Sequence, residues 1–541
     1  MKISGNRLYT GYFLVTLTFV FLLMISGYFQ IGFLSDDYVN IYSANVSSLL
    51  EKFTSNVVFH NHLLLRPFWF LSLSLDIFIK KALSLSAGNF IVFRIHNLIL
   101  YLVFAFLISY IYYFKSKNYS LSIFIYTIVL IFPNNIHSLI WVVCRHDTQF
   151  GIFGLLSLFM ILLYADKNKL ILLLLSLIFL GTALLYKETA IIFPFVILFA
   201  LYYFNEGNNK VKIKNYVFHF LILFAYVVYK LFFLNSSTGN IINNYSVNFT
   251  DRLSVLPKAL FSLFSSTDYL SLSYYFRQGN MVYLLLILIP FVLISITSFI
   301  SYKEKPKKVI LLILLFIILI MPNIIVGYFR PQLIIVPFSV LLFFIMSDVS
   351  LINDKSRLLI KYLLAVLIFI FTIGSYSVIR DYEYSYSKIK SNINLISDNL
   401  SAYKEKPVIL FLPSRFKQTY ILDNVQAAYN YFKYNDFVIK DTVQGFVNYA
   451  ALDAESLNSE ITIQRINEST IVATCTGETQ FFYNISNNSI TDYENEYIKC
   501  EFQKEYMFLN KCKKVKLILK DLSKYSYIAL TNNKLINLNP R

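Results

Sequence analysis

Long apolar segments alternate with short polar ones over the first 380 residues of the chain. A helix needs about 20 predominantly apolar residues to cross the hydrocarbon core of a bilayer. By this criterion the pattern predicts about eleven transmembrane helices. They lie near residues 11–34, 91–114, 119–136, 149–165, 169–186, 189–204, 216–234, 281–301, 309–326, 332–347 and 358–379. The first segment is too long for the apolar region of a signal peptide, so we interpret it as a membrane anchor.

The composition supports the same interpretation. Of the 541 residues, 57% are hydrophobic and only 15% are charged, against about 25% charged residues in an ordinary soluble domain. This balance excludes a disordered chain, and it excludes a single soluble globule, which has no means of burying so much apolar surface. We therefore predict a polytopic α-helical membrane protein embedded in the lipid bilayer.

The net charge of +17 indicates orientation rather than nucleic-acid binding. Lys2 and Arg7 precede the first apolar segment, which places the N-terminus in the cytoplasm. With eleven spans, alternate loops are cytoplasmic, and these loops carry clusters of basic residues, as the positive-inside rule requires. The clusters are Lys115 and Lys117; Lys167 and Lys169; Lys210, Lys212 and Lys214; Lys303, Lys305, Lys307 and Lys308; and Lys355, Arg357 and Lys361.

An odd number of spans places residues 381–541 outside the cytoplasm, as a domain separate from residues 1–380. Its pattern predicts a small mixed α/β domain after a linker helix. The predicted elements are helices at 382–404 and 423–434 and strands at 408–412, 460–463, 471–473, 480–483 and 515–519. Cys475, Cys500 and Cys512 fall in this domain, where an extracytoplasmic location permits one disulfide and leaves one thiol over.

Ionisable residues next to the spans gather on the predicted outer side, where we expect them to converge on one site. Arg66 also begins an amphipathic stretch, ending at Lys81, that we expect to lie along the membrane surface. The outer clusters are Asp36 and Asp37; His60, His62 and Arg66; Arg145, His146 and Asp147; Lys187 and Glu188; and Arg330.

Each of these residues also has a purely structural explanation. An Asp at a helix end often caps the helix, and Arg or Lys side chains often extend to lipid headgroups. The pair His60 and His62 is too weak a signal for a metal site, so no cofactor is predicted and a divalent metal is not indicated. Trp69 and Trp141 are expected in the interfacial aromatic belt. Four basic residues in outer connections nevertheless run against the positive-inside rule, which favours a functional role.

The residue types suggest a definite chemistry. A carboxylate accepts a proton from an incoming hydroxyl, and Arg and Lys bind a phosphate and stabilise its charge as it leaves. The chain has no Walker A sequence and no strand–GxGxxG–helix unit for a nucleotide. A donor reached from outside is then a lipid phosphate, and transfer of a sugar from polyprenyl phosphate to an acceptor hydroxyl fits these features.

At these residues, residues 1–380 resemble the GT-C superfamily of integral-membrane glycosyltransferases. The resemblance is carried by Asp36-Asp37, Arg66-Pro67, Arg145-x-Asp147, Lys187-Glu188 with Pro194, and Arg330. It implies a polyprenyl-phosphate sugar donor, inversion at the anomeric carbon and no metal requirement.

The resemblance also implies roles for individual residues. Asp36 becomes the candidate base, and Asp37 orients the acceptor or shares that role, although many relatives have Asp-Glu here. Donor-phosphate binding is assigned to Arg66, Arg145, Lys187 and Arg330. Contacts to the rest of the substrates are expected from His62, His146, Asp147 and Glu188.

These features predict a membrane hexosyltransferase of the bacterial inner membrane, with its C-terminal domain in the periplasm. Its expected partners are a lipid-linked hexose, such as glucose, and a surface glycan such as lipopolysaccharide O-antigen. Three alternatives stay open: a transporter or flippase of lipid-linked sugars, an O-antigen polymerase or ligase, and a receptor. A transporter predicts broken helices or charges at mid-membrane and internal repeats.

Overall fold

The structure of the protein is a computed structural model, and it describes most of the chain. The described ranges are 2–34, 36–54, 57–59, 62–86, 89–204, 213–234, 249–265, 306–327, 329–349, 354–399, 407–416, 419–420, 443–451, 461–477, 480–483, 492–506, 511–531 and 534–539, with single residues and short pieces between 281 and 296.

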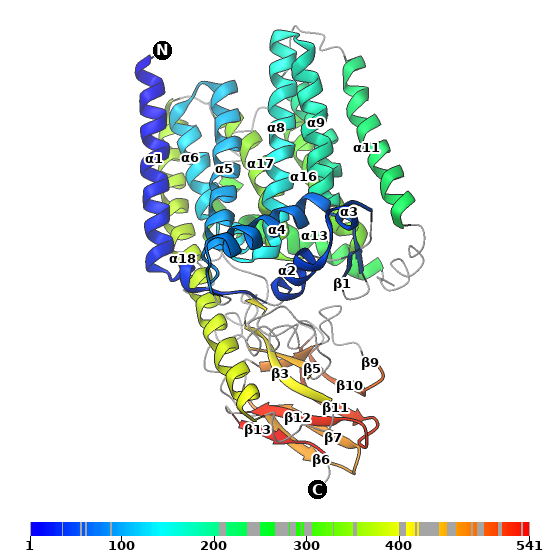
Figure 1. Ribbon diagram of the computed structural model, residues 1–541. Helices are drawn as coiled ribbons and strands as arrows, with labels where there is room; N and C mark the ends of the chain where they lie inside the picture. The colour runs from blue at the N-terminus through cyan, green and yellow to red at the C-terminus, as the bar shows by residue number, and fades with distance from the viewer. Residues whose placement is uncertain are drawn as a thin grey trace.

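The first part of the chain is a bundle of helices (Figure 1). The α-helices are α1 (Lys2–Ile25), α2 (Asp37–Val46), α3 (Leu49–Thr54), α4 (Pro67–Ala82), α5 (Ile91–Ser116), α6 (Tyr119–Ile131), α7 (Pro133–Ile140), α8 (Arg145–Lys167), α9 (Leu170–Tyr186), α10 (Phe193–Phe204), α11 (Ile213–Leu234), α13 (Phe249–Phe264), α16 (Pro306–Val326), α17 (Ile335–Val349) and α18 (Asp354–Asn399). Short 3-10 turns connect several of them: η1 (Tyr28–Gln30), η2 (Val142–Cys144), η3 (Glu188–Ile192) and η4 (Pro331–Ile334).

Five helices in the described part of the chain are long and apolar enough to cross a membrane. They are Asn6–Ile25, Ile91–Ser116, Val142–Lys167, Lys307–Val326 and Tyr362–Ile396. A sixth is formed if α6 and α7, which meet at a bend of 61°, count as one broken span. Four shorter apolar helices accompany them: Leu170–Tyr186, Glu188–Phe204, Tyr216–Phe232 and Pro331–Ser347. Most of the predicted span at 281–301 lies outside the described residues, and the total of eleven stays a prediction.

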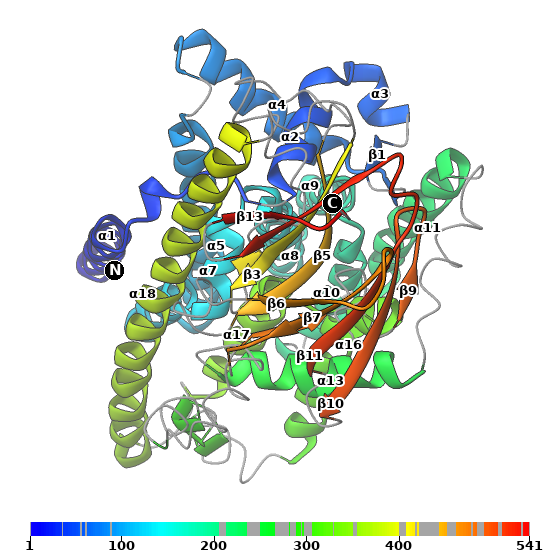
Figure 2. The same cartoon turned by 90° about the horizontal axis from the view of Figure 1, so that it is seen from below.

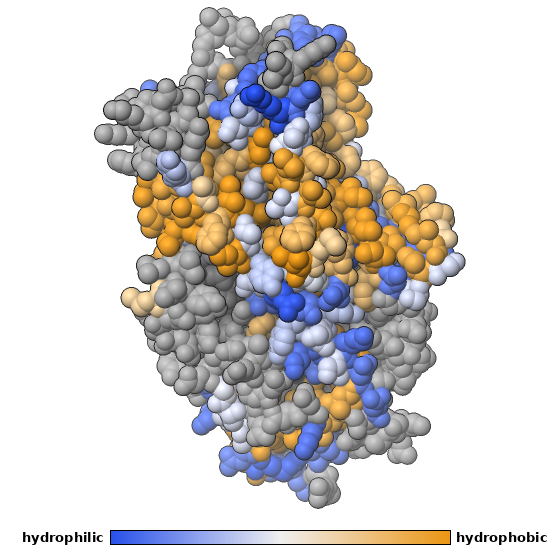
Figure 3. Space-filling view, turned by 90° about the vertical axis from the view of Figure 1, so that its left-hand side faces the viewer, coloured by the Kyte–Doolittle hydropathy of each residue, from blue (hydrophilic) through white to orange (hydrophobic). Residues whose placement is uncertain are grey.

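An apolar band crosses the surface of the bundle, with hydrophilic residues above and below it (Figure 3). Helix α1 shows how the band is built, because Phe13, Phe21 and Met24 are each more than 60% exposed on it. A surface of this kind is stable against lipid tails rather than water. The fold is therefore that of a multi-pass membrane protein.

Three predicted boundaries differ from the structure, each for a local reason. The first span ends at Ile25 rather than at residue 34, because Gly27 adopts the left-handed conformation (φ 84°) that stops a helix. The third is broken at Pro133, which lacks the N–H that a continuous helix needs there. The last span and the predicted linker helix form one helix, α18, whose apolar positions Ile389 and Ile393 are buried.

The C-terminal region contains one mixed sheet in the order β13-β12-β3-β5-β8-β11-β10-β9, with β4, β7 and β6 attached. Strand β3 is parallel to β12 and β5, and the other pairings are antiparallel. The strands are β3 (Val408–Phe416), β4 (Thr419–Tyr420), β5 (Val443–Ala451), β6 (Ile461–Arg465), β7 (Thr470–Cys475), β8 (Gln480–Tyr483), β9 (Tyr493–Glu494), β10 (Ile498–Tyr506), β11 (Lys511–Leu519), β12 (Ser526–Thr531) and β13 (Lys534–Asn537).

Each predicted C-terminal strand coincides with one of these strands, whereas the predicted helix at 423–434 lies outside the described residues. Cys475, Cys500 and Cys512 are buried thiols in the sheet, and no disulfide joins cysteines within the described part. A separate hairpin, β1 (Val57–Phe59) and β2 (His62–Leu64), belongs to the loop after α3.

The sheet lies beyond one end of the bundle, opposite the N-terminus (Figure 1). Helices α2, α4 and α13 lie across this same end, and Figure 2 views them past the sheet. Helix α18 joins the two parts, since Ser385 Oγ lies 2.6 Å from Thr419 Oγ1 in β4 and the Tyr382 hydroxyl lies 2.7 Å from His137 Nδ1 in α7. The sheet and the loops that carry the predicted site therefore occupy one end of the molecule.

Candidate functional site

The two adjacent acids at the start of α2 have different environments. Asp37 is fully buried, and its two carboxylate oxygens accept hydrogen bonds from the backbone N–H groups of Leu34 (2.9 Å) and Val143 (2.8 Å). These bonds hold the beginning of α2 against η2. Asp36 precedes the helix and is only half-buried. Asp36 therefore offers the more accessible carboxylate of the pair.

Burial raises the pKa of Asp37 to about 7, although the N–H groups of Leu34 and Val143 and the nearby Arg94 favour its charged form. In the unfolded chain the pKa of an Asp is about 4. Between about pH 4 and pH 7 the folded protein holds a proton that the unfolded chain has released. The contribution of Asp37 to stability is therefore lost as the pH rises toward 7.

We expect the thermal stability of the purified protein to fall more steeply between pH 5 and pH 8 than that of Asp37→Asn. The Asn variant loses one backbone hydrogen bond at every pH, but it has no carboxyl to titrate. The difference between the pH dependences of the two proteins therefore reports the titration of Asp37. Over this pH range the free energy of unfolding of the wild type falls by at most about 3 kcal/mol more than that of the variant. Melting curves of both proteins in one detergent measure it, and parallel curves would contradict the assignment.

Two ion pairs, of which Lys187–Asp147 is buried, bring together three of the predicted outer clusters. Arg66, at the start of α4, bonds Glu188 through two of its nitrogens, with Nε 2.9 Å from Oε2. Lys187 bonds Asp147 at the start of α8. The charge of Arg66 also acts on Asp147, so the two pairs are electrostatically coupled. We refer to Arg66, Asp147, Lys187 and Glu188 as the ion-pair cluster.

Aromatic rings enclose this cluster on one side. His146 lies over the ring of Trp69 with centroids 5.1 Å apart, and the Arg66 guanidinium lies 5.8 Å from the centre of the same ring. The His146 Nδ1–H donates to the Val143 carbonyl. Trp69 and Trp141 are only 1% and 2% exposed, so both tryptophans are buried and the prediction that they form an interfacial belt is wrong.

Arg330 reaches the same region from the loop before η4. Its guanidinium lies 5.3 Å from the ring centre of Trp141. The charges of Arg330, Lys187 and Asp147 all act on Cys144, the last residue of η2, and so does the charge of Asp37. Residues from four separate loops are thus close to one another around η2, as the sequence predicted.

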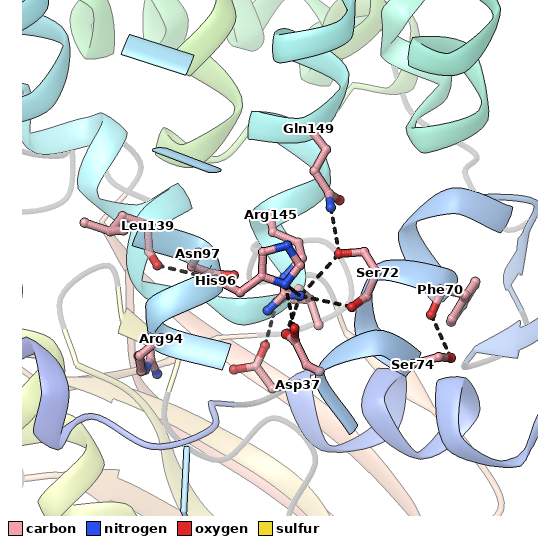
Figure 4. A network of polar contacts seen from close by, with 12 residues as sticks. Asp37, Phe70, Ser72, Ser74, Arg94, His96, Asn97, Leu139, Arg145 and Gln149 are labelled. Atoms are coloured by element: carbon pink, nitrogen blue, oxygen red, sulfur yellow. Dashed lines mark hydrogen bonds and ion pairs between the residues drawn. The ribbon is translucent and has the colours of Figure 1, made fainter. Parts of the chain in front are cut away.

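Arg145 does not join the ion-pair cluster. Its guanidinium pairs with Asp76 of α4 at 2.5 Å, and both side chains are fully buried. Figure 4 shows Arg145 beside His96 and Ser72, with Gln149 donating to the Ser72 hydroxyl. His96 Nδ1 lies 2.5 Å from Oδ1 of Asp76, so His96 and Arg145 both contact this carboxylate. We call Ser72, Asp76, His96, Arg145 and Gln149 the Asp76 network.

The sequence prediction of histidine contacts is tested only in part by the structure. His60 lies outside the described residues, and so does the side chain of His62, although its backbone belongs to β2. In the part of the chain that the structure describes, no group of three His, Cys, Asp or Glu side chains is placed to hold a metal ion.

Several residues near the site were not predicted from the sequence: Asp76, Arg94, His96 and Lys230. The signal that each offered was an ionisable residue inside an apolar or amphipathic segment. Arg94, for example, lies in α5 and donates to the carbonyls of Ile31, Gly32 and Ile140, which holds the segment before Asp36 in place.

No family model matches this chain, and no curated protein matches it. Its function is therefore argued from the site. Four cations (Arg66, Lys187, Lys230 and Arg330) lie near η2 and η3, and two of them are paired with the carboxylates Asp147 and Glu188. Such a group of cations suits an anionic ligand, and the ordered carboxylates suit hydroxyl groups next to it.

Proposed function

We propose that the protein is an inverting glycosyltransferase of the GT-C type, with about eleven spans. It moves a hexose from a polyprenyl-phosphate donor to a hydroxyl of a surface glycan, such as lipopolysaccharide O-antigen, on the outer side of the bacterial inner membrane. The observation that carries the proposal is the half-buried Asp36, one residue before the Asp37 that bonds η2, together with the cations Arg66, Lys187 and Arg330 near η2 and η3.

The chemistry divides between these two parts. The Asp36 carboxylate accepts the proton of the acceptor hydroxyl while that oxygen bonds to the anomeric carbon. The bond from this carbon to the phosphate oxygen breaks, and its electron pair leaves with the polyprenyl phosphate. The phosphate changes from a diester with one negative charge to a monoester with nearly two at about neutral pH. Cations already in place stabilise the added charge.

Individual roles follow from the environments. Arg66, Lys187 and Arg330 are proposed to bind the donor phosphate. Asp147 and Glu188 hold Lys187 and Arg66 in position. Asp37 positions Asp36, because both of its oxygens are bonded to backbone N–H groups.

Arg145 and the two histidines have less direct roles in this proposal. Arg145 is assigned to support, since it is fully buried against Asp76. His146 is assigned to the donor side, next to Trp69 and Arg66. His62 keeps its predicted role in substrate binding, and the domain after residue 380 is proposed to lie in the periplasm.

Purified protein in lipid nanodiscs is expected to move radiolabelled sugar from polyprenyl-phosphate glucose, or from another hexose donor of that class, to isolated O-antigen glycan. Protein heated beyond its unfolding transition is the control, and a nucleotide-sugar is expected to be inactive as donor. Counting of label in the washed glycan measures transfer. Absence of label with every polyprenyl-phosphate hexose and acceptor tested would overturn the proposal.

One observation favours a second function, the transport of lipid-linked sugars. The helix pair α6 and α7 is bent by 61° at Pro133, and broken helices are common in transporters. Transport and transfer are distinguished in liposomes that carry a labelled lipid-linked sugar in one leaflet. A transporter moves the intact lipid to the other leaflet without any glycan acceptor, whereas a transferase releases the sugar only when the acceptor is present.

A further inference from the structure

Helix α11 brings two polar side chains to the ion-pair cluster. Tyr226 and Lys230 are four positions apart, which places them on the same face of the helix. Lys230 Nζ lies 4.0 Å from Glu188 Oε2. Tyr226 is 7% exposed and is electrostatically coupled to both Glu188 and Arg66. Both side chains therefore border the cluster from a helix that the sequence motifs do not include.

The bonding capacity of these two side chains is not used within the described protein. Arg66 bonds both oxygens of Glu188, and Lys187 bonds Asp147, so those cations already have close carboxylate partners. Lys230 makes only its long contact with Glu188. The buried Tyr226 hydroxyl has no hydrogen-bond partner there, and neither does the buried Thr189 Oγ1 beside Glu188.

The two unbonded hydroxyls favour a ligand that accepts hydrogen bonds, because a buried donor without a partner is unfavourable, and the Lys230 ammonium favours one with negative charge. Phosphate oxygens accept and never donate when ionised. A phosphate next to Lys230 and Tyr226 satisfies these donors without breaking either ion pair. The carboxylates of the cluster, by contrast, repel a phosphate and serve to hold the other cations.

The position of α11 indicates that such a phosphate belongs to a lipid. The helix lies at the edge of the bundle in both Figure 1 and Figure 2. Its outward face is apolar and exposed, with Leu221, Phe224 and Val228 between 48% and 67% exposed. Helix α11 therefore borders the ion-pair cluster with one face and lipid with the opposite face, so a phosphate at the cluster lies about one helix diameter from the lipid-facing band.

We propose that Lys230 and Tyr226 bind the phosphate of a prenyl-phosphate donor, whose isoprenoid chain enters the lipid at the edge of the bundle that α11 forms. This inference rests on the proposed function and adds a second phosphate-binding element to it. Lys230 and Tyr226 are binding residues that recognise the part of the donor that is not transferred.

The test is equilibrium binding of radiolabelled farnesyl phosphate to the full chain in phosphatidylcholine nanodiscs. Lys230→Gln is expected to weaken binding roughly tenfold or more, and Tyr226→Phe about threefold, as the loss of a charged and a neutral hydrogen bond predicts. Lys230→Arg keeps the charge and stays within about threefold of the wild type. The matched control is Lys115→Gln, which removes a lysine paired with Asp166 away from the cluster, and it leaves binding unchanged.

The outcomes separate the two proposals. If the wild type binds farnesyl phosphate and Lys230→Gln binds it equally well, this inference is wrong and the proposed function stands. If the wild type does not bind it at all, the proposed function fails as well.

Further arms identify the ligand and guard against misfolding. Farnesol, which lacks the phosphate, is expected not to compete. Competition by phosphatidylglycerol as strong as that by farnesyl phosphate would show a general phospholipid site and overturn the assignment to prenyl phosphates. Melting curves show which variants are folded, and if Lys230→Gln unfolds, Tyr226→Phe and Lys230→Arg decide the question.

Discussion

Asp36→Asn is expected to lower sugar transfer by about 10²–10⁴-fold, the usual contribution of a positioned general base. Asparagine has nearly the same shape but does not take the proton of the acceptor hydroxyl. Because Asp36 is half-buried and makes no cap bond from its side chain to α2, we expect the fold to be unchanged. The measurement is the rate of label transfer to glycan at saturating donor, together with a melting curve.

Asp37→Asn provides the matched control, since it makes the same chemical change one residue later. Its carboxylate is bonded to Leu34 and Val143, so we expect it to lower the melting temperature as well as the rate. Asp36→Glu retains a base on a longer side chain and is expected to keep part of the activity. Transfer by Asp36→Asn at the wild-type rate would assign the base elsewhere.

Asp76→Asn is expected to destabilise the folded protein by about 3–5 kcal/mol, because it leaves the charge of Arg145 buried without its partner. Both side chains are fully buried, and solvent has no access to compensate the lost carboxylate. His96 loses the same partner. Denaturation in mixed micelles, followed by a helical signal, measures the effect.

The double variant Asp76→Leu with Arg145→Met tests whether the two residues act as a pair. Removing both charges leaves neither one unpaired, so we expect it to be more stable than either single variant. If the Arg145→Met and Asp76→Leu effects simply add, the two residues do not act as a pair. Unchanged donor binding in the folded double variant would support the separation of the Asp76 network from the ion-pair cluster.

Much of the fold follows from hydropathy, because a bilayer forces apolar segments of about 20 residues into helices whose backbone is fully bonded. Five of the eleven described strands after residue 407 were also predicted from the sequence pattern. Breaks were harder to place, since they depend on single residues. Pro133 lies inside an apolar segment that looks continuous, and Gly27 ends α1 nine residues before Asp36.

The sequence singled out the four residues of the ion-pair cluster, but it did not show which of them contact each other. Arg66 and Glu188 are 122 positions apart, and nothing in either segment specifies the other as its partner. Arg145 and Asp147 are neighbours on one helix turn, yet their side chains join different groups, because residues two apart on a helix do not share a face. Such choices depend on packing between helices, which a single sequence does not display.

The length of helix α18 helps to set the distance between the membrane and the sheet that follows it. Its 46 residues extend roughly 70 Å at about 1.5 Å per residue, more than twice the roughly 30 Å of a bilayer core. The part of α18 beyond the membrane is held by two contacts, Tyr382 with His137 of α7 and Ser385 with Thr419 of β4. Inserting or deleting one helical turn in this part of α18 would move the sheet by about 5.4 Å relative to the bundle, so the two contacts could not both be kept.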